Sequence, residues 1–382
     1  MKHLAVALLS LCLVGCASAP PMPPPAPLFH DAAFAPAAVA IEPDAALALS
    51  PAMRGYLAGR FVNRLHSGDK RRQLIDALYR GDLHLEYDAA YTRTAAEAFE
   101  ARSGNCLALV LMTAAFAKEL GLRVTFQSVI GEQAWDRAAD LYIAIGHINL
   151  VLEEPAEPSG FIATTSSAML VDFLPPRDAR LLRTRMVDEK AVIAMYLNNR
   201  AVEALTQGRT DEAYWWARAA LVRDPEQLES YVTLGVVYRA RGQAAWADDA
   251  LQRVLAREPE HLIALSNRVV VLRDLKRGAE ADALAQRLAA LDPHPPFSYF
   301  SAGREAFDAK RFDVARRLFA KEVERAPYHH EFEYWLAASY AALGDGERAR
   351  QHLQRAMEVS TTRKDHALYE AKLDRLRALR VQ

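Results

Sequence analysis

The chain has 382 residues, of which 51% are hydrophobic and 25% charged, enough for roughly two or three domains with apolar cores. Its 47 basic and 48 acidic side chains give a formal net charge of −1, which excludes a global electrostatic attraction to nucleic acid. After the N-terminus, no segment is long and uncharged enough to cross a membrane.

The first 15 residues have the order of an export signal: a short basic start, an apolar stretch over residues 4–14, and small residues before Cys16. The tetrad Leu-Val-Gly-Cys at residues 13–16 resembles the bacterial lipobox. That resemblance implies a signal peptide over residues 1–15, acylation at Cys16 and attachment to a membrane through the N-terminal lipid only. Ala17 after the lipidated cysteine favours the outer membrane, facing the periplasm, by analogy with lipoprotein sorting. An ordinary signal peptide or a chance Gly-Cys pair is the alternative.

The cysteine count leaves one thiol without a partner. Cys12 would leave with the signal and Cys16 would carry lipid, so Cys106 has no cysteine with which to form an intramolecular disulfide. In an oxidising compartment a lone thiol indicates a reactive or catalytic residue, although simple burial also explains one.

Residues 16–48 are rich in alanine and proline. Because proline fixes φ and removes a hydrogen-bond donor, this segment is predicted to be a semi-rigid tether, partly in polyproline II conformation. A ligand for a proline-binding groove is the alternative.

Helix signals begin at Ser50-Pro51 and predict helices over residues 53–65 and 71–79. A capping box from Thr94 to Glu97 predicts a third helix that ends near residue 102. Residues 103–105 interrupt it, and Cys106 begins an amphipathic helix that ends at residue 120, before Gly121. Cys106 therefore lies at a helix N-terminus, where backbone amides and the helix dipole favour a thiolate.

The pattern then changes to extended. Residues 123–130, 141–152 and 168–174 are rich in β-branched and aliphatic side chains and predict adjacent antiparallel strands. The second segment contains His147 and the third Asp172. An imidazole placed in this way could take the thiol proton of Cys106 while the carboxylate orients the ring.

Three short motifs carry a family resemblance: Gly-Asn-Cys at residues 104–106, Gly-His-Ile-Asn at 146–149 and Val-Asp-Phe at 171–173. Their order and context resemble the transglutaminase-like superfamily, which has a papain-like α+β core. For residues 49–190 the resemblance implies Cys106 as nucleophile, His147 as general base and then acid, and Asp172 as the orienting group. Gln127 is a candidate donor to the oxyanion.

One departure from the family changes the expected reaction. Animal protein-crosslinking enzymes carry an aromatic residue after the cysteine, whereas Leu107 follows Cys106 here. Hydrolysis by a thiol peptidase or amidase is therefore favoured over crosslinking. Each triad residue also has a structural explanation as a buried cysteine, a core histidine or a strand-ending aspartate, so a degenerate, non-catalytic domain is the alternative.

The C-terminal half repeats every 34 residues. Two registers carry the repeat: Pro225, Pro259, Pro293 and Pro327 form one, and Ala213, Ala247, Ala281, Ala315 and Ala349 form the other. The pattern resembles tetratricopeptide repeats (TPRs), which are stacked helix pairs. It implies five repeats over residues 191–361 and a capping helix over residues 362–382, forming an all-α superhelical solenoid after the α+β domain.

Such a solenoid is expected to hold a peptide or extended protein segment in its groove, recruiting a substrate or a partner. Bracing of the enzyme domain is the alternative role of the repeats. No phosphate-binding loop or paired-cysteine metal spacing is present in the sequence, and we expect neither a cofactor nor a metal site. The sequence thus predicts an envelope lipoprotein with a thiol hydrolase domain, or alternatively a non-catalytic scaffold for envelope protein assembly.

Overall fold

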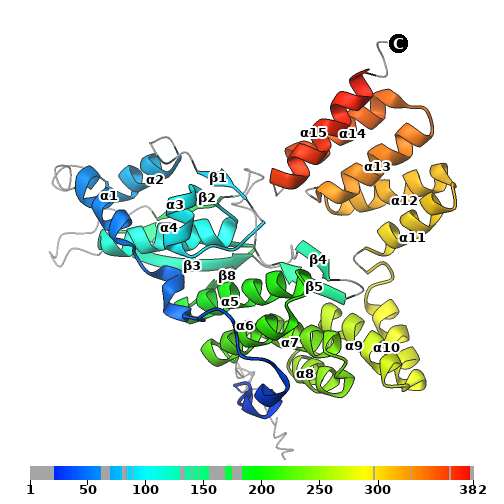
Figure 1. Cartoon of the computed structure of the whole chain (residues 1–382), viewed down its shortest axis with the longest axis horizontal. Helices are drawn as coiled ribbons and strands as arrows, with labels where there is room; N and C mark the ends of the chain where they lie inside the picture. The colour runs from blue at the N-terminus through cyan, green and yellow to red at the C-terminus, as the bar shows by residue number, and fades with distance from the viewer. Residues whose placement is uncertain are drawn as a thin grey trace, which may run out of the picture.

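The computed structural model describes residues 21–61, 69–79, 83, 85–88, 90–129, 134–138, 141–145, 147–154, 168–173, 183–295, 297–327, 329–360 and 363–378. The expected signal peptide, the lipidation candidate Cys16 and Gly146 of the second motif lie outside these residues. Within the described ranges, none of the helices combines the length and apolar character that a membrane span requires. Figure 1 shows an α+β unit beside an array of helix pairs.

Four helices build one side of the α+β unit: α1 (Pro51–Phe61), α2 (Lys70–Tyr79), α3 (Ala95–Ala101) and α4 (Cys106–Glu119). The expected capping box is present, because Thr94 accepts from the Glu97 backbone while the Glu97 side chain bonds back to the Thr94 backbone. Every residue of α4 from Cys106 to Ala117 is buried, so α4 is the central helix of the unit. The helices predicted here are confirmed over the described residues.

Helix α4 packs on a four-stranded antiparallel sheet of order β7-β6-β3-β8. On β6, Ile148, Leu150 and Leu152 alternate with less buried or polar neighbours and lie in the same apolar cluster as α4. The strands are β3 (Arg123–Val129), β6 (Ile148–Glu153), β7 (Met169–Val171) and β8 (Thr184–Val187). This unit is α+β as expected, while its assignment to the papain-like fold stays a prediction.

The single strand predicted over residues 141–152 is wrong. The structure divides it into β5 (Leu141–Ile145) and β6, which belong to different sheets. Strand β5 instead forms an antiparallel hairpin with β4 (Ala134–Ala138), a strand that the sequence analysis missed. The hairpin lies against helices of the repeat array, and His147 lies directly between it and β6.

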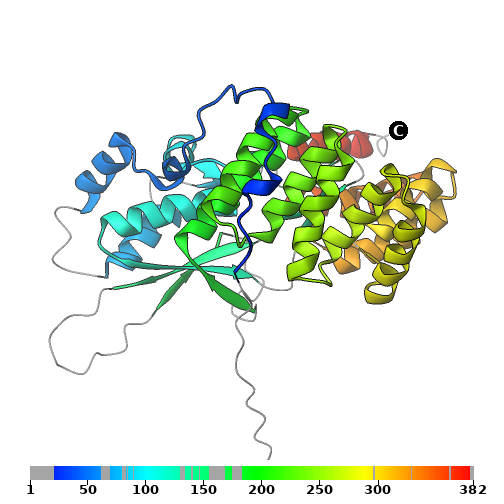
Figure 2. The ribbon, with the colours of Figure 1, turned by 90° about the horizontal axis from the view of Figure 1, so that it is seen from below.

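Five consecutive helix pairs follow (Figures 1 and 2). The first three pairs pack on one another, and the fourth packs on the fifth, as in a TPR solenoid. The pairs are α5 (Glu189–Thr206) with α6 (Thr210–Arg223), α7 (Leu228–Ala240) with α8 (Ala244–Arg257), α9 (Leu262–Asp274) with α10 (Gly278–Leu291), α11 (Ser298–Asp308) with α12 (Phe312–Arg325), and α13 (His330–Ala342) with α14 (Gly346–Glu358). The final helix α15 (Arg363–Ala378) packs on α14, in the position expected for a cap.

The 34-residue register has a direct structural cause. All five repeat alanines, at residues 213, 247, 281, 315 and 349, are 0% exposed, because each lies where paired helices cross closely. The turn within each pair also repeats at this interval. Its residue with positive φ is Gly208, Gly242, Lys276, Lys310 and Gly344 in successive pairs.

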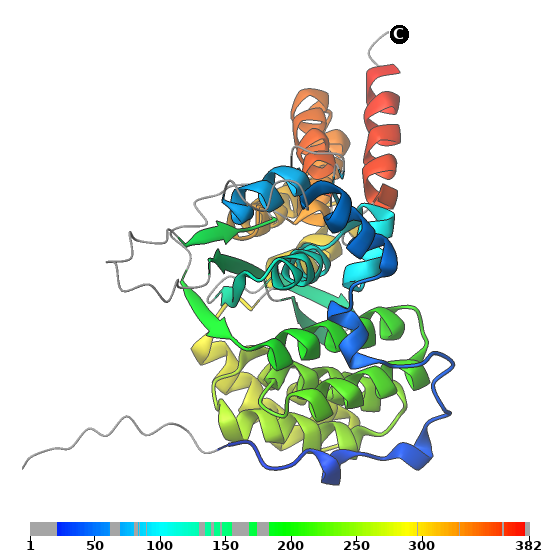
Figure 3. The same ribbon diagram turned by 90° about the vertical axis from the view of Figure 1, so that its left-hand side faces the viewer.

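The segment that precedes α1 differs from the expected free tether. Residues 22–35, here called the N-terminal strap, lie along α6, α7 and α8 (Figure 3). The strap includes the short turns η1 (Ala26–Leu28) and η2 (Asp31–Ala33). A third turn, η3 (Pro43–Leu47), packs against α3, α4 and α5. Aromatic and apolar side chains cause this docking, since Leu28 and Phe34 are buried.

Gly303→Ala is expected to destabilise the fourth helix pair. A Cβ atom at Gly303 would lie 2.7 Å from Cε1 of Phe319, whose ring is 0% exposed. Relief requires movement of a packed ring, so the free energy of unfolding should fall by about 1–3 kcal/mol, measured by chemical denaturation. Gly278→Ala is the control, because a Cβ atom there has no neighbour within 4 Å. Equal losses at both positions would contradict the packing argument.

Candidate thiol site

Cys106 is the first residue of α4, and Asn105 caps that helix. The Asn105 side chain accepts a hydrogen bond from the Ala108 backbone N–H at 2.9 Å. The Cys106 sulfur therefore lies beside the unpaired backbone amides and the positive end of the helix dipole. Gly104 allows this tight entry, because a Cβ atom at Gly104 would lie 2.8 Å from Cβ of Ala108.

The structure brings His147 and Asp172 together. Nε2 of His147 lies 2.9 Å from Oδ2 of Asp172, and the two side chains are 11% and 12% exposed. Their strands position them: His147 immediately precedes β6, Asp172 immediately follows β7, and β6 and β7 pair antiparallel. The antiparallel arrangement predicted for these segments is confirmed, and it places the carboxylate against the imidazole.

The other ring nitrogen of His147 is available to the thiol. Nδ1 is buried and makes no hydrogen bond with the described part of the chain. Burial lowers the pKa of His147, but the hydrogen bond that the ring donates to Asp172 and the interaction with the Cys106 side chain outweigh it and raise the pKa to about 9. The imidazole therefore interacts with the carboxylate on one side and with the sulfur on the other.

The His147 pKa makes the stability of the fold depend on pH. A folded pKa of about 9, above the ordinary 6.5, contributes stability that is fully present below pH 6.5 and is lost as the pH rises to about 9. The free energy of unfolding should therefore fall by up to about 3 kcal/mol across this window. Denaturation at both pH values measures it, and His147→Gln should remove this part of the pH dependence. An unchanged pH profile in that variant would contradict it.

Two residues beside Asp172 were missed as site residues. Asn149 is 0% exposed, and its Nδ2 donates to Oδ2 of Asp172 at 3.3 Å. The hydroxyl of Tyr79 donates to the Asp172 backbone carbonyl at 2.7 Å, and its ring stacks on Phe173. Burial, together with the Asp172 charge, raises the pKa of Tyr79 to about 12. The sequence signal for Asn149 was its position two residues after His147, which in a strand selects the same face.

The Tyr87 side chain interacts with the backbone of Cys106. Strand β1 (Glu86–Tyr87) pairs in parallel with β2 (Ser103–Gly104), which sets Tyr87 opposite Gly104. Burial and the nearby Cys106 side chain raise the pKa of Tyr87, while a hydrogen bond from the Cys106 backbone opposes the rise. The oxyanion candidate Gln127 lies on β3, directly opposite Asn149 on β6 and Met186 on β8. It is therefore the cross-strand neighbour of the residue that bonds Asp172, and its role stays a prediction.

Helix α5, the first repeat helix, fixes the N-cap residue of α4 through a chain of hydrogen bonds. Glu203 on α5 accepts a hydrogen bond from the Thr92 backbone N–H at 2.7 Å. The Thr92 hydroxyl in turn accepts from Nδ2 of Asn105 at 2.7 Å, so that Asn105 is fixed from both sides. Arg200 pairs with Glu203 at 3.2 Å and lies over the Tyr91 ring. This chain of contacts links the repeat array to the residue before Cys106.

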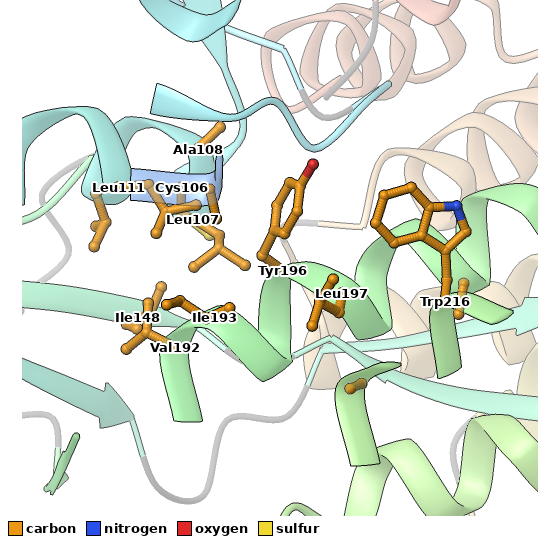
Figure 4. Packing of buried hydrophobic residues seen from close by; sticks show 14 of the residues in the cluster. Cys106, Leu107, Ala108, Leu111, Ile148, Val192, Ile193, Tyr196, Leu197 and Trp216 are labelled. Carbon is orange, nitrogen blue, oxygen red and sulfur yellow. The ribbon is translucent and has the colours of Figure 1, made fainter. Parts of the chain in front are cut away.

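Apolar packing closes the same interface. Figure 4 shows Cys106 and Leu107 above Ile148 on β6 and facing Val192 and Ile193 of α5. Cys106 itself is 8% exposed. Among the described residues, no group of three or more His, Cys, Asp or Glu side chains is arranged to hold a metal ion.

Comparison with solved structures finds TPR proteins that cover less than half of this chain. No family model matches the sequence, and no curated protein matches it. A solved structure of YrrB, described as a TPR protein with an unusual peptide-binding site, is 23% identical over 47% of this chain and 92% of that chain, with a TM-score of 0.26. TTC0263, a TPR protein of Thermus thermophilus, is 18% identical over 47% and 98%, with a TM-score of 0.32. MamA is 19% identical over 42% and 93%, with a TM-score of 0.24.

Proposed function

We propose that this chain is a helical-repeat scaffold that binds a peptide or extended protein segment, and that its N-terminal unit hydrolyses an amide of such a segment. The scaffold role is supported by the five helix pairs in 34-residue register, since repeat arrays of this kind present long continuous surfaces. The chemical role is supported by one observation: the 2.9 Å contact between Nε2 of His147 and Asp172, in a ring that also interacts with the Cys106 side chain.

In the proposed reaction, Nδ1 of His147 takes the proton from Cys106, and the thiolate attacks the carbonyl carbon of the amide. His147 returns the proton to the departing amine as the C–N bond breaks, which leaves a thioester on Cys106. Water then loses a proton to His147 and attacks the thioester carbonyl, the C–S bond breaks, and a carboxylic acid leaves while His147 returns the proton to the Cys106 sulfur. Asp172 keeps the ring oriented and stabilises its protonated form.

A scaffold without catalysis is the second candidate, and the burial of Cys106 favours it. Cys106 is 8% exposed and belongs to the main apolar cluster, as a structural cysteine would. In this case the α+β unit binds a peptide without cleaving it, and the whole chain acts as an adaptor for protein assembly in the envelope.

Reaction with p-nitrophenyl acetate distinguishes the two candidates. For an active thiol we expect a burst of nitrophenol that is stoichiometric with protein, and an acetyl group located on Cys106 by mass spectrometry. Cys106→Ala is the control and should show no burst. A native wild-type protein that reacts no faster than this control would eliminate the hydrolase and leave the adaptor.

We also propose that the chain is lipid-anchored through Cys16 to the outer membrane, facing the periplasm. The lipobox-like tetrad at residues 13–16 supports this proposal. Cys16→Ser is expected to prevent incorporation of a fatty-acid label and to release the protein from the membrane fraction. Equal labelling of the variant and the wild type would contradict it.

A further inference from the structure

The N-terminal strap is held mainly through its backbone. Side chains of the repeat helices bond to its peptide groups, as in recognition of an extended peptide. Four of these contacts are the His30 N–H with Tyr214 Oη at 2.9 Å, the Ala35 carbonyl with Trp215 Nε1 at 2.6 Å, the Ala33 carbonyl with Arg241 at 2.9 Å, and the Leu28 carbonyl with the Tyr238 hydroxyl. Backbone recognition is independent of most side chains of the bound segment.

One carboxylate fixes the register of the strap. Oδ1 of Asp31 accepts from the Tyr214 hydroxyl at 2.5 Å and from Nε of Arg218 at 2.8 Å. Burial raises the pKa of Asp31, but these two hydrogen bonds and the Arg218 charge outweigh it and hold the pKa below its usual value. Charge-assisted bonds of this kind are stronger than neutral ones.

Aromatic side chains on both sides of Asp31 complete the contact. Phe34 stacks on Tyr214 with ring centroids 3.9 Å apart and an interplanar angle of 2°. His30 stacks on Trp246 at 3.8 Å and 11°. Phe34 is 6% exposed, so the face of the repeats provides a buried position for a ring.

We propose that this face of α6, α7 and α8 is a peptide-binding site, which the strap occupies as a tethered ligand. The partner that binds this site is an extended protein segment with a carboxylate between two ring-bearing side chains. This segment displaces the strap. The complementary charges of Arg218 and Asp31 and the four backbone contacts define this ligand chemistry. A tethered ligand competes at high effective concentration, so the site accepts a partner readily only when the strap is weakened. This inference does not depend on thiol chemistry.

Binding of a fluorescein-labelled synthetic peptide, with the sequence of residues 22–36, to the full chain tests the proposal by fluorescence polarisation. Asp31→Arg sets a cation against Arg218 and should release the strap. We expect this variant to bind the labelled peptide at least about tenfold more tightly than the wild type. A labelled peptide with asparagine at the position of Asp31 should bind the variant about tenfold more weakly.

Asp44→Arg is the matched control. Asp44 pairs with Arg223 at 3.1 Å, but its side chain is 86% exposed, so this variant should behave like the wild type. Tyr238→Phe is the milder second variant, because it keeps the ring and removes only the hydroxyl, which donates to Leu28 and interacts with Tyr214 and the His30 backbone. It should increase peptide binding in the same direction. Two results of the binding assay would overturn the proposal. One is that the peptide shows no saturable binding to natively folded Asp31→Arg or Tyr238→Phe. The other is that the wild type, these two variants and Asp44→Arg all bind the peptide equally. A wild-type dimer that dissociates in Asp31→Arg would also overturn the proposal, since the strap would then belong to a second copy.

Discussion

Replacement of His147 by alanine is expected to slow alkylation of Cys106 by iodoacetamide by about a hundredfold at neutral pH. The reason is the position of the ring, which is held by Asp172 at 2.9 Å through Nε2 and interacts with the Cys106 side chain. Without the ring, no described base takes the proton of the thiol or balances the charge of the thiolate. The rate of label incorporation at Cys106, followed by mass spectrometry, measures the effect.

His366→Ala is the control for this measurement, because His366 is exposed on α15. It should leave the alkylation rate unchanged. Asp172→Asn should give an intermediate rate, since the ring remains but loses the charge that stabilises its protonated form. Alkylation of His147→Ala at the wild-type rate would show that Cys106 is an ordinary thiol and would favour the adaptor without catalysis.

Glu203→Ala is expected to lower the free energy of unfolding by about 3 kcal/mol, because it leaves buried partners without their acceptor. The Thr92 backbone N–H loses its hydrogen bond, and Arg200, whose side chain is 10% exposed, loses its carboxylate. Thr92 also holds Asn105, so the loss extends to the cap of α4. Chemical denaturation measures the stability, and the alkylation rate of Cys106 reports on the cap.

Glu203→Gln separates the two roles of this side chain, since it keeps an oxygen for the Thr92 N–H and removes the charge opposite Arg200. It should lose less stability than Glu203→Ala and keep the cap in place. Glu370→Ala, at an exposed position of α15, is the surface control and should change little. Equal losses in the free energy of unfolding for Glu203→Ala and Glu370→Ala would show that the contact with Thr92 does not stabilise the fold.

Local signals allowed much of the fold to be predicted. The capping box at Thr94 and Glu97 depends only on residues three apart, and the helix that begins at Cys106 follows from its own apolar pattern and from Asn105. The repeats were predictable for a related reason. One weak pattern occurs five times at intervals of 34 residues, which makes it recognisable. In each helix pair a buried alanine occupies the same position, where the two helices cross closely.

Contacts between distant residues were not predictable in this way. Glu203 meets Thr92 across 111 positions, and its sequence neighbours are those of an ordinary helix surface. The apolar run over residues 141–152 suggested one strand because β5 and β6 are both extended, and periodicity does not mark a change of sheet. The strap was predicted to be a spacer from its prolines, but Phe34 and Leu28 supply the apolar area that docks it.

The strap also constrains the order of events during synthesis. Asp31 is made early, yet its partner Tyr214 lies 183 positions later, and the partner of Leu28 is 210 positions away. Because the partners of the strap lie on α6, α7 and α8, these helices must form before the strap can dock, and docking is a late step of folding. Until α8 is complete, Phe34 and the aromatic face of α6 remain exposed in the folding chain. Exposed apolar surface of this kind is what chaperones bind.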